Sequence, residues 1–267
     1  MLNKNFTYLP ALKTLGNDLN AIFKAVHLSS FKSLILPADL FDWLDMQKNN
    51  NSSWSQFDLN NANFKILSVL DIIPEHFAAE VPMQNKTIIR NFINNFDSLL
   101  DQLVRLKINS CSLNLNLENA FKIHEKEIAA VELLKKISPY LIRKNISMLL
   151  PVRIPSVFSV DFEKYSFFHR NIMNPNMKLS IEIHPHEFRI KQNPLEVLKP
   201  FKYKIGMFSF IYEPEAGNYL VDKLLTPWLD ALQELSYNGI IVFAPLTAKP
   251  EVFSRELTKL TDLIQQS

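Results

Sequence analysis

The chain has 267 residues, of which 47% are hydrophobic and 21% are charged. This is the composition of a globular protein with a sizeable core, and it excludes an intrinsically disordered chain. The 29 basic and 27 acidic residues give a formal net charge of +2, without a long basic run, so a nucleic-acid partner is not expected.

Eight short apolar segments have the pattern of β-strands. In chain order they are residues 5–9, 31–36, 64–71, 111–117, 146–152, 178–184, 204–212 and 239–245. Amphipathic stretches with helical spacing lie between or after them, most clearly at Thr87–Leu106, His124–Arg143, Tyr219–Leu235 and Pro250–Gln265. In the second of these helices Pro139 is expected to kink the helix or to end its first part. The same helix has a predicted apolar stripe of Ile128, Val131, Leu134 and Leu141.

Alternation of strand and helix predicts a parallel sheet with helical crossovers. Eight such units in a chain of this length favour one (β/α)8 TIM barrel, an α/β fold, as a single domain over residues 1–267. The alternative is an open doubly wound sheet. No glycine-rich phosphate loop follows any predicted strand, so the barrel is the preferred prediction.

Apolar and polar side chains alternate along two of the predicted strands. In the fourth strand Leu113, Leu115 and Leu117 oppose Ser112, Asn114 and Asn116, and in the sixth Leu179, Ile181 and Ile183 oppose Ser180, Glu182 and His184. In a barrel the apolar sets would face the helices and the polar sets the interior. A polar interior indicates a hydrated or ligand-accepting cavity. A network in which these side chains form hydrogen bonds with one another and with water explains the pattern equally well.

The N-terminal segment MLNKNFTYLPALK lacks the apolar core of a signal peptide, and no apolar run approaches the length of a membrane span. The lone Cys111 cannot form an intramolecular disulfide, which fits a reducing compartment. We therefore expect a cytoplasmic protein without a membrane partner. Cys111 also lacks a neighbouring histidine in sequence, and there is no nucleophile signature such as G-x-S-x-G.

Five segments carry a resemblance to a known family. They are TYLPALKTLGNDLNAIFKAVHLSSFKSLIL, RKNISMLLPVRIP, MNPNMKLSIEIHPHEF, YKIGMFSFIYEPEAG and PWLDALQELSYNGIIVFAP. In that order they resemble the first two strands with their helix, the fifth, sixth and seventh strands, and the last helix and strand of the xylose-isomerase-like TIM barrels. This is the sugar-phosphate isomerase/epimerase superfamily. The resemblance implies isomerisation or epimerisation of a sugar or related polyol.

The resemblance also implies a divalent metal held at the carboxyl ends of strands five to eight. The positions that match the family's four ligands are Pro151, Glu182, Ser209 and Ala244. Only Glu182 has a side chain suited to a divalent metal, because proline and alanine lack a donor and a neutral hydroxyl is a poor ligand. We therefore expect a divergent member without the family metal site. The sequence identifies no other cofactor.

The sharpest local motif is Glu182-Ile-His184-Pro-His186-Glu187. On an extended strand Glu182, His184 and His186 share one face and could bind a transition metal, unless Pro185 breaks the strand. Glu182 or His184 could instead serve as a general base without a metal. The alternative is a polar strand end with solvated histidines.

Four further side chains are candidates for binding substrate: Asn116, Arg153, His186 and Glu213. Arg153 is the one cation placed by the sequence to meet an anionic ligand. Glu213 follows strand seven, where barrel loops carry chemistry, although the turn residues around it explain this loop equally well. Trp228 falls on an apolar helical stripe and is predicted to be a core residue.

Two hypotheses for the function follow. The first is a divergent isomerase or epimerase that acts on a sugar-like small molecule through Glu182, His184 and Arg153. The second is a catalytically inactive barrel that binds a small molecule or a partner protein at its mouth.

Overall fold

Eight parallel strands form the centre of the molecule in the computed structural model. The structure describes residues 6–13, 19–41, 64–72, 86–113, 124–154, 174–184, 193–214, 225–247 and 249–265. The strands are β1 Thr7–Pro10, β2 Ser33–Pro37, β3 Lys65–Leu70, β4 Ser110–Ser112, β5 Ser147–Arg153, β6 Met177–Ile183, β7 Ile205–Tyr212 and β8 Ile240–Pro245. Each falls within a segment predicted from the sequence, or within one or two residues of it.

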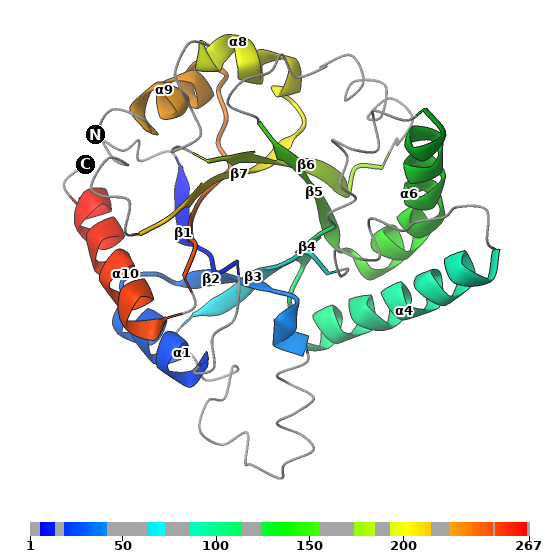
Figure 1. Cartoon of the computed structure of the whole chain (residues 1–267), viewed down its shortest axis with the longest axis horizontal. Coiled ribbons are helices and arrows are strands. Elements are labelled where there is room, and N and C mark those ends of the chain that lie inside the picture. The colour runs from blue at the N-terminus through cyan, green and yellow to red at the C-terminus, as the bar shows by residue number, and fades with distance from the viewer. Residues whose placement is uncertain are drawn as a thin grey trace.

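The strands close into a barrel (Figure 1). Hydrogen-bonded neighbours follow the order β1-β8-β7-β6-β5-β4-β3-β2, and a parallel bridge between Ala11 and Ile35 joins the first strand to the second. The backbone N–H of Leu12 donates to the carbonyl of Ile35 over 2.9 Å at this seam. The predicted (β/α)8 barrel is therefore confirmed.

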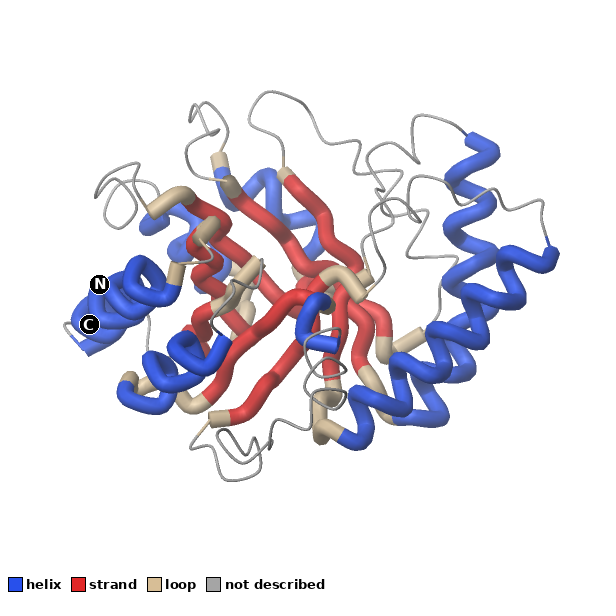
Figure 2. The backbone as a smooth tube through the Cα atoms, turned by 60° about the horizontal axis from the view of Figure 1, so that its bottom comes forward, coloured by secondary structure: helices blue, strands red, loops and turns tan. Residues whose placement is uncertain are grey.

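Helices surround the strands, as Figure 2 also shows. They are α1 Leu19–Leu28, α4 Lys86–Arg105, α6 His124–Lys144, α8 Pro194–Leu198 with a following 3-10 turn at Lys199–Phe201, α9 Thr226–Glu234 and α10 Pro250–Gln265. Three pairs of helices pack side by side: α1 with α10, α4 with α6 and α8 with α9. No helix in the described part of the chain is long and apolar enough to span a bilayer.

Helix α6 excludes one of the two outcomes expected at Pro139 and corrects one residue of the predicted apolar stripe. It continues through Pro139 to Lys144, so the proline does not end it. Ile137 and Leu141, before and after Pro139 in the sequence, are fully buried. The free energy gained by packing these side chains outweighs the loss of the backbone hydrogen bond that proline cannot donate. Ile128 is 48% exposed, whereas Val131 and Leu134 are buried, because periodicity defines a helix face but not how far that face overlies the barrel.

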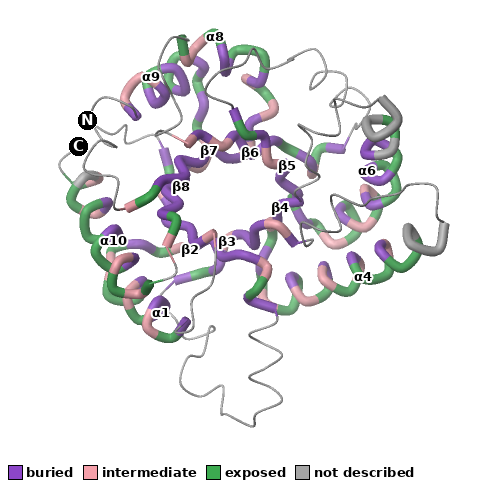
Figure 3. Tube along the Cα trace, in the orientation of Figure 1, coloured by how far each residue is buried: buried purple, intermediate pink, exposed green. Residues whose placement is uncertain are grey.

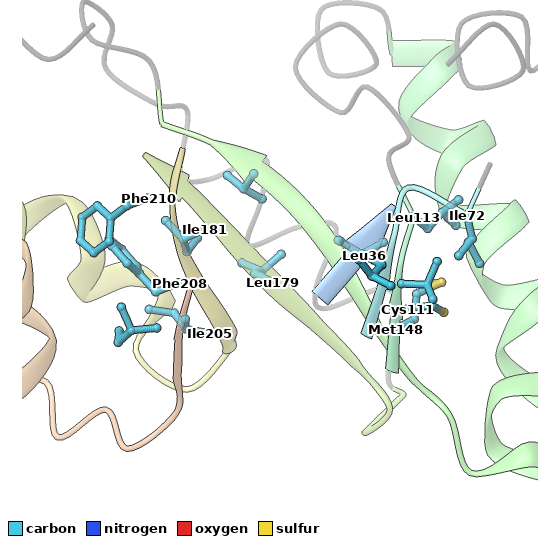
Figure 4. Packing of buried hydrophobic residues seen from close by; sticks show 14 of the residues in the cluster. Leu36, Ile72, Cys111, Leu113, Met148, Leu179, Ile181, Ile205, Phe208 and Phe210 are labelled. Carbon is cyan, nitrogen blue, oxygen red and sulfur yellow. The ribbon is translucent and has the colours of Figure 1, made fainter. Parts of the chain in front are cut away.

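The buried side chains form two separate cores. The larger lies between strands and helices and includes Leu179, Ile181, Phe208 and Phe210 (Figure 4). The smaller is made of strand residues of the opposite orientation: Leu9, Ala11, Ile35, Leu70, Leu149, Met207, Ile211, Val242 and Ala244. This second cluster fills the barrel interior. Figure 3 shows the strands mostly buried and the exposed residues on the outer faces of the helices.

The alternation predicted along β6 is confirmed. Leu179, Ile181 and Ile183 belong to the outer core, so Ser180 and Glu182 between them face the barrel interior. On β4 Leu113 lies in the outer core and Ser112 points inward, while residues 114–117 lie outside the described residues. Trp228 is 3% exposed and belongs to the outer core, as predicted.

Candidate functional site

Polar side chains gather where the barrel strands end. Glu182 lies near the carboxyl end of β6, Ser112 ends β4, and Lys13 and Asp71 follow β1 and β3. Because all strands are parallel, their carboxyl ends meet at one face of the barrel, which is where barrels of this kind carry their sites. We call this face the mouth.

An ion pair crosses the mouth from β1 to β6. Lys13 Nζ lies 2.7 Å from Glu182 Oε1, and the two side chains are 17% and 12% exposed. Lys13 continues the inward alternation of Leu9 and Ala11, which explains why it points inside. Burial by itself lowers the pKa of Lys13, but the carboxylates of Glu182 and Asp71 outweigh it and raise that pKa above 10.5. The side chain is therefore an ammonium cation at neutral pH.

Asp71 belongs to the same group of charges. Its backbone has a φ of 51°, in the left-handed region that few non-glycine residues adopt. This turn interrupts the strand alternation, since Leu70 packs inside the barrel and Ile72 in the outer core. Burial raises the pKa of Asp71 above its ordinary value of 3.8, Lys13 lowers it, and Glu182 raises it. Left-handed residues of this kind cluster at functional sites.

Ser112 holds Asp71 in this conformation. The backbone N–H of Asp71 donates to Ser112 Oγ over 2.7 Å, and the Ser112 hydroxyl donates to Asp71 Oδ1 over 3.2 Å. The backbone N–H of Ile72 donates to the carbonyl of Ser112 over 3.0 Å. Ser112 thus holds the turn at Asp71 with three hydrogen bonds, one of which is made to the carboxylate.

Below the mouth, Ser180 Oγ is buried without a hydrogen-bond partner in the described part of the chain. Ser180 precedes Glu182 by two residues on the same inward face of β6, so its hydroxyl lies one layer deeper. A buried hydroxyl of this kind calls for a water molecule or a ligand group.

The opposite side of the mouth is apolar. Ala11, Ile211 and Ala244 all belong to the inner core, and Ile211 and Ala244 are paired in register on β7 and β8. The mouth therefore combines the polar groups of Lys13, Asp71, Ser112 and Glu182 with an apolar surface of Ala11, Ile211 and Ala244. This is the distribution of a small-molecule site, in which a few polar groups orient a ligand against an apolar wall.

The residues selected from the sequence lie as follows. Arg153 is paired in register with Glu182 on the adjacent strand, and its side chain is exposed. His184 directly follows β6 and is half-buried, and Glu213 is exposed in the turn after β7. Asn116 and His186 lie outside the described residues.

Two charged residues of the mouth were missed by sequence reasoning. The sequence predicts Arg153 as a cation for an anionic ligand, and the structure adds Lys13, which contacts Glu182. The available signal was the spacing Leu9, Ala11, Lys13 beyond the first strand. Asp71 could have been noticed as a carboxylate directly after the third strand, although simple alternation directs it outward.

The four positions that match the family's metal ligands all belong to the inward-facing set. Glu182 is paired in register with Ser209, which is 2% exposed, and Ala244 lies in the inner core. Pro151 shares the inward orientation of Leu149 on β5. Together these positions offer one carboxylate and one hydroxyl. No group of three or more His, Cys, Asp or Glu that could hold a metal occurs among the described residues.

Cys111 is not part of this site. It is fully buried in the outer core, and burial raises the pKa of its thiol to about 12. A thiol that stays protonated at neutral pH is a poor nucleophile.

The solved structures most informative for this chain are xylose-isomerase-like barrels. D-psicose 3-epimerase from Clostridium cellulolyticum H10 matches with a TM-score of 0.70 and 12% identity over 98% of this chain and 99% of the other. D-allulose 3-epimerase from Methylomonas sp. matches with a TM-score of 0.66 and 13% identity over 99% and 98%. A family 2 AP endonuclease from Brucella melitensis matches with a TM-score of 0.62 and 12% identity over 91% and 94%.

No protein-family model and no curated protein sequence matches the chain. The fold is that of the xylose-isomerase-like TIM barrels, as the sequence resemblance predicted. At these identities the likeness establishes the fold only, and the fold hosts both sugar epimerases and an AP endonuclease. The residues at the mouth are therefore the basis for a proposal on function.

Proposed function

We propose that this protein is a divergent isomerase or epimerase that acts on a sugar or related polyol at the barrel mouth. The observation that carries the proposal is the Lys13–Glu182 ion pair, which lies inside the mouth with both side chains largely shielded from water. A carboxylate can accept the proton next to a carbonyl, and a neighbouring cation can stabilise the negative charge that develops on the carbonyl oxygen.

The reaction needs two groups. Glu182 accepts a proton from the carbon next to the substrate carbonyl. The C–H electron pair then forms a carbon–carbon double bond, and the carbonyl π pair moves onto oxygen as an enediolate. Return of that proton from Glu182 to the former carbonyl carbon, with transfer of the neighbouring hydroxyl proton to the former carbonyl oxygen, completes an isomerisation. Epimerisation needs in addition a second acid on the opposite face of the enediolate, which delivers a proton to the carbon that lost one. The negative charge on oxygen must be stabilised by positive charge in the mouth.

The polarity of the residues at the mouth supports a sugar-like ligand. Hydroxyl groups of such a molecule can bond to the polar side at Asp71 and Ser112, and its C–H faces can lie against Ala11, Ile211 and Ala244. Arg153 on the rim, next to Glu182 in register, suits an anionic substituent such as a phosphate. His184 and Glu213 are the remaining candidates at the ends of β6 and β7.

Deuterium exchange tests the proposal. The protein is incubated in D2O with D-fructose, D-allulose and D-tagatose, with and without a phosphate group, and ¹H NMR follows loss of the proton next to the carbonyl. We expect exchange with wild type and none with Glu182→Gln. The matched control is Glu234→Gln, an exposed glutamate on α9 that should leave exchange unchanged.

A second candidate function is a catalytically inactive barrel that binds a small molecule. Pro151 and Ala244, which bring no functional group to the mouth, favour it. This function predicts saturable ligand binding by calorimetry without any exchange in D2O. If no sugar of the panel shows either exchange or binding, a sugar-like ligand is refuted for both candidate functions.

A further inference from the structure

The donor chemistry of the mouth does not fit the divalent metal that the fold family implies. Mg²⁺, Mn²⁺ and related ions take several oxygen or nitrogen ligands, with carboxylates foremost. Pro151 and Ala244 supply no donor, and Ser209 supplies a neutral hydroxyl. The fourth position, Glu182, already has one carboxylate oxygen bonded to Lys13 Nζ at 2.7 Å.

The same region nevertheless holds a fixed positive charge. Lys13 follows β1, which is separated from β6 by β8 and β7 in the hydrogen-bonded order, and it reaches Glu182 across the interior. Its side chain is 17% exposed, so a counter-ion from solvent does not screen it as it would on the surface. Asp71 interacts with the same ammonium from β3. The cation is thus bonded to the carboxylate of Glu182 and also lies within electrostatic range of the carboxylate of Asp71.

We propose that the Lys13 ammonium takes the place of the divalent metal, so that the mouth is a metal-independent site whose positive charge is covalently attached to β1. This inference rests on the proposed function for its chemical role, but its statement about metals stands separately. In the proton transfer, Glu182 gains the proton while the enediolate oxygen gains the charge. Lys13 donates a hydrogen bond to that oxygen and remains an ammonium throughout, so no metal or redox partner is needed.

The first experiment concerns the metal alone. Wild-type protein, purified without chelator or histidine tag, is analysed for metals by mass spectrometry and titrated with MnCl2 by electron paramagnetic resonance. We expect no stoichiometric metal and no saturable Mn²⁺ binding. A stoichiometric divalent ion in wild type would overturn the inference, whether or not any sugar is turned over.

The second experiment removes the cation. In Lys13→Met the carboxylates of Glu182 and Asp71 lose the ammonium that interacts with both, and we expect Mn²⁺ binding to appear and to disappear again in Lys13→Met/Glu182→Gln. A folded Lys13→Met variant that does not bind Mn²⁺ would show that the Lys13 ammonium does not take the place of a divalent metal. Circular dichroism checks that each variant is folded. If a variant is unfolded, the Mn²⁺ titration of the wild-type protein alone tests whether the mouth binds a divalent metal.

The third experiment concerns catalysis. Wild-type exchange should be unaffected by dialysis against EDTA, and Lys13→Met should lower kcat by about 100-fold or more with a smaller change in KM. Exchange that is lost on chelation, or that proceeds in Lys13→Met at the wild-type rate, would overturn the inference. If the wild-type protein catalyses deuterium exchange in none of the ketoses, the proposed function is refuted instead. The Mn²⁺ titrations would still test whether the mouth binds a divalent metal.

Discussion

Replacing Lys13 by methionine should destabilise the folded protein even in the absence of any ligand. Methionine preserves most of the side-chain volume but removes the ammonium that pairs with Glu182. Loss of one partner from a fully buried ion pair costs about 3–5 kcal/mol, and loss from an exposed pair about 0–1 kcal/mol. With side chains 17% and 12% exposed, the Lys13–Glu182 pair lies nearer the buried limit. We expect a decrease of about 2–3 kcal/mol in the free energy of unfolding.

The matched control is a pair of the same charge types on the surface. Lys135 Nζ lies 3.4 Å from Glu132 Oε1, with side chains 49% and 52% exposed, so Lys135→Met should cost at most about 0.5 kcal/mol. Urea unfolding at pH 7, followed by circular dichroism, measures both variants. Adding Glu182→Gln to Lys13→Met should recover about 1 kcal/mol, because the unpaired carboxylate is then gone. Equal effects of the two lysine substitutions would refute the claim that burial strengthens the mouth pair.

Three further predictions concern stability. Burial raises the pKa of Asp71 above 3.8, so the stability that its protonated form contributes is full below that value and is lost as pH rises through the folded-state pKa. Asp71→Asn should therefore gain stability relative to wild type in urea melts as pH rises above about 4; a pH-independent difference would contradict this. Gly239→Ala should cost about 1–3 kcal/mol in thermal unfolding, because a Cβ there would lie 2.3 Å from the ring of Tyr237, and a neutral result would mean that the ring moves freely. Tyr212→Phe should cost about 1–2 kcal/mol, because the buried Glu256 loses the hydroxyl that donates to it over 3.2 Å; an unchanged urea midpoint would show that the glutamate is satisfied by its other partners.

The sequence by itself determined the barrel. Eight apolar segments separated by amphipathic stretches are a local signal, because burial on both faces of a parallel strand leaves a short apolar run and burial of one face of a helix leaves a periodic pattern. The alternation along β6 likewise placed Glu182 in the interior and Leu179 and Ile181 against the helices, before any strand partner was known.

Only the tertiary structure decided what the mouth contains. Lys13 and Glu182 are 169 residues apart in the sequence. No local pattern in β1 or β6 indicates that the two strands contact each other through these side chains, so the contact follows from the curvature of the closed sheet. Asp71 reaches the charged group through a left-handed backbone that Ser112 of the next strand holds by hydrogen bonds. Periodicity gives the face on which a side chain lies, whereas the partner it meets depends on which strands the closed sheet brings together.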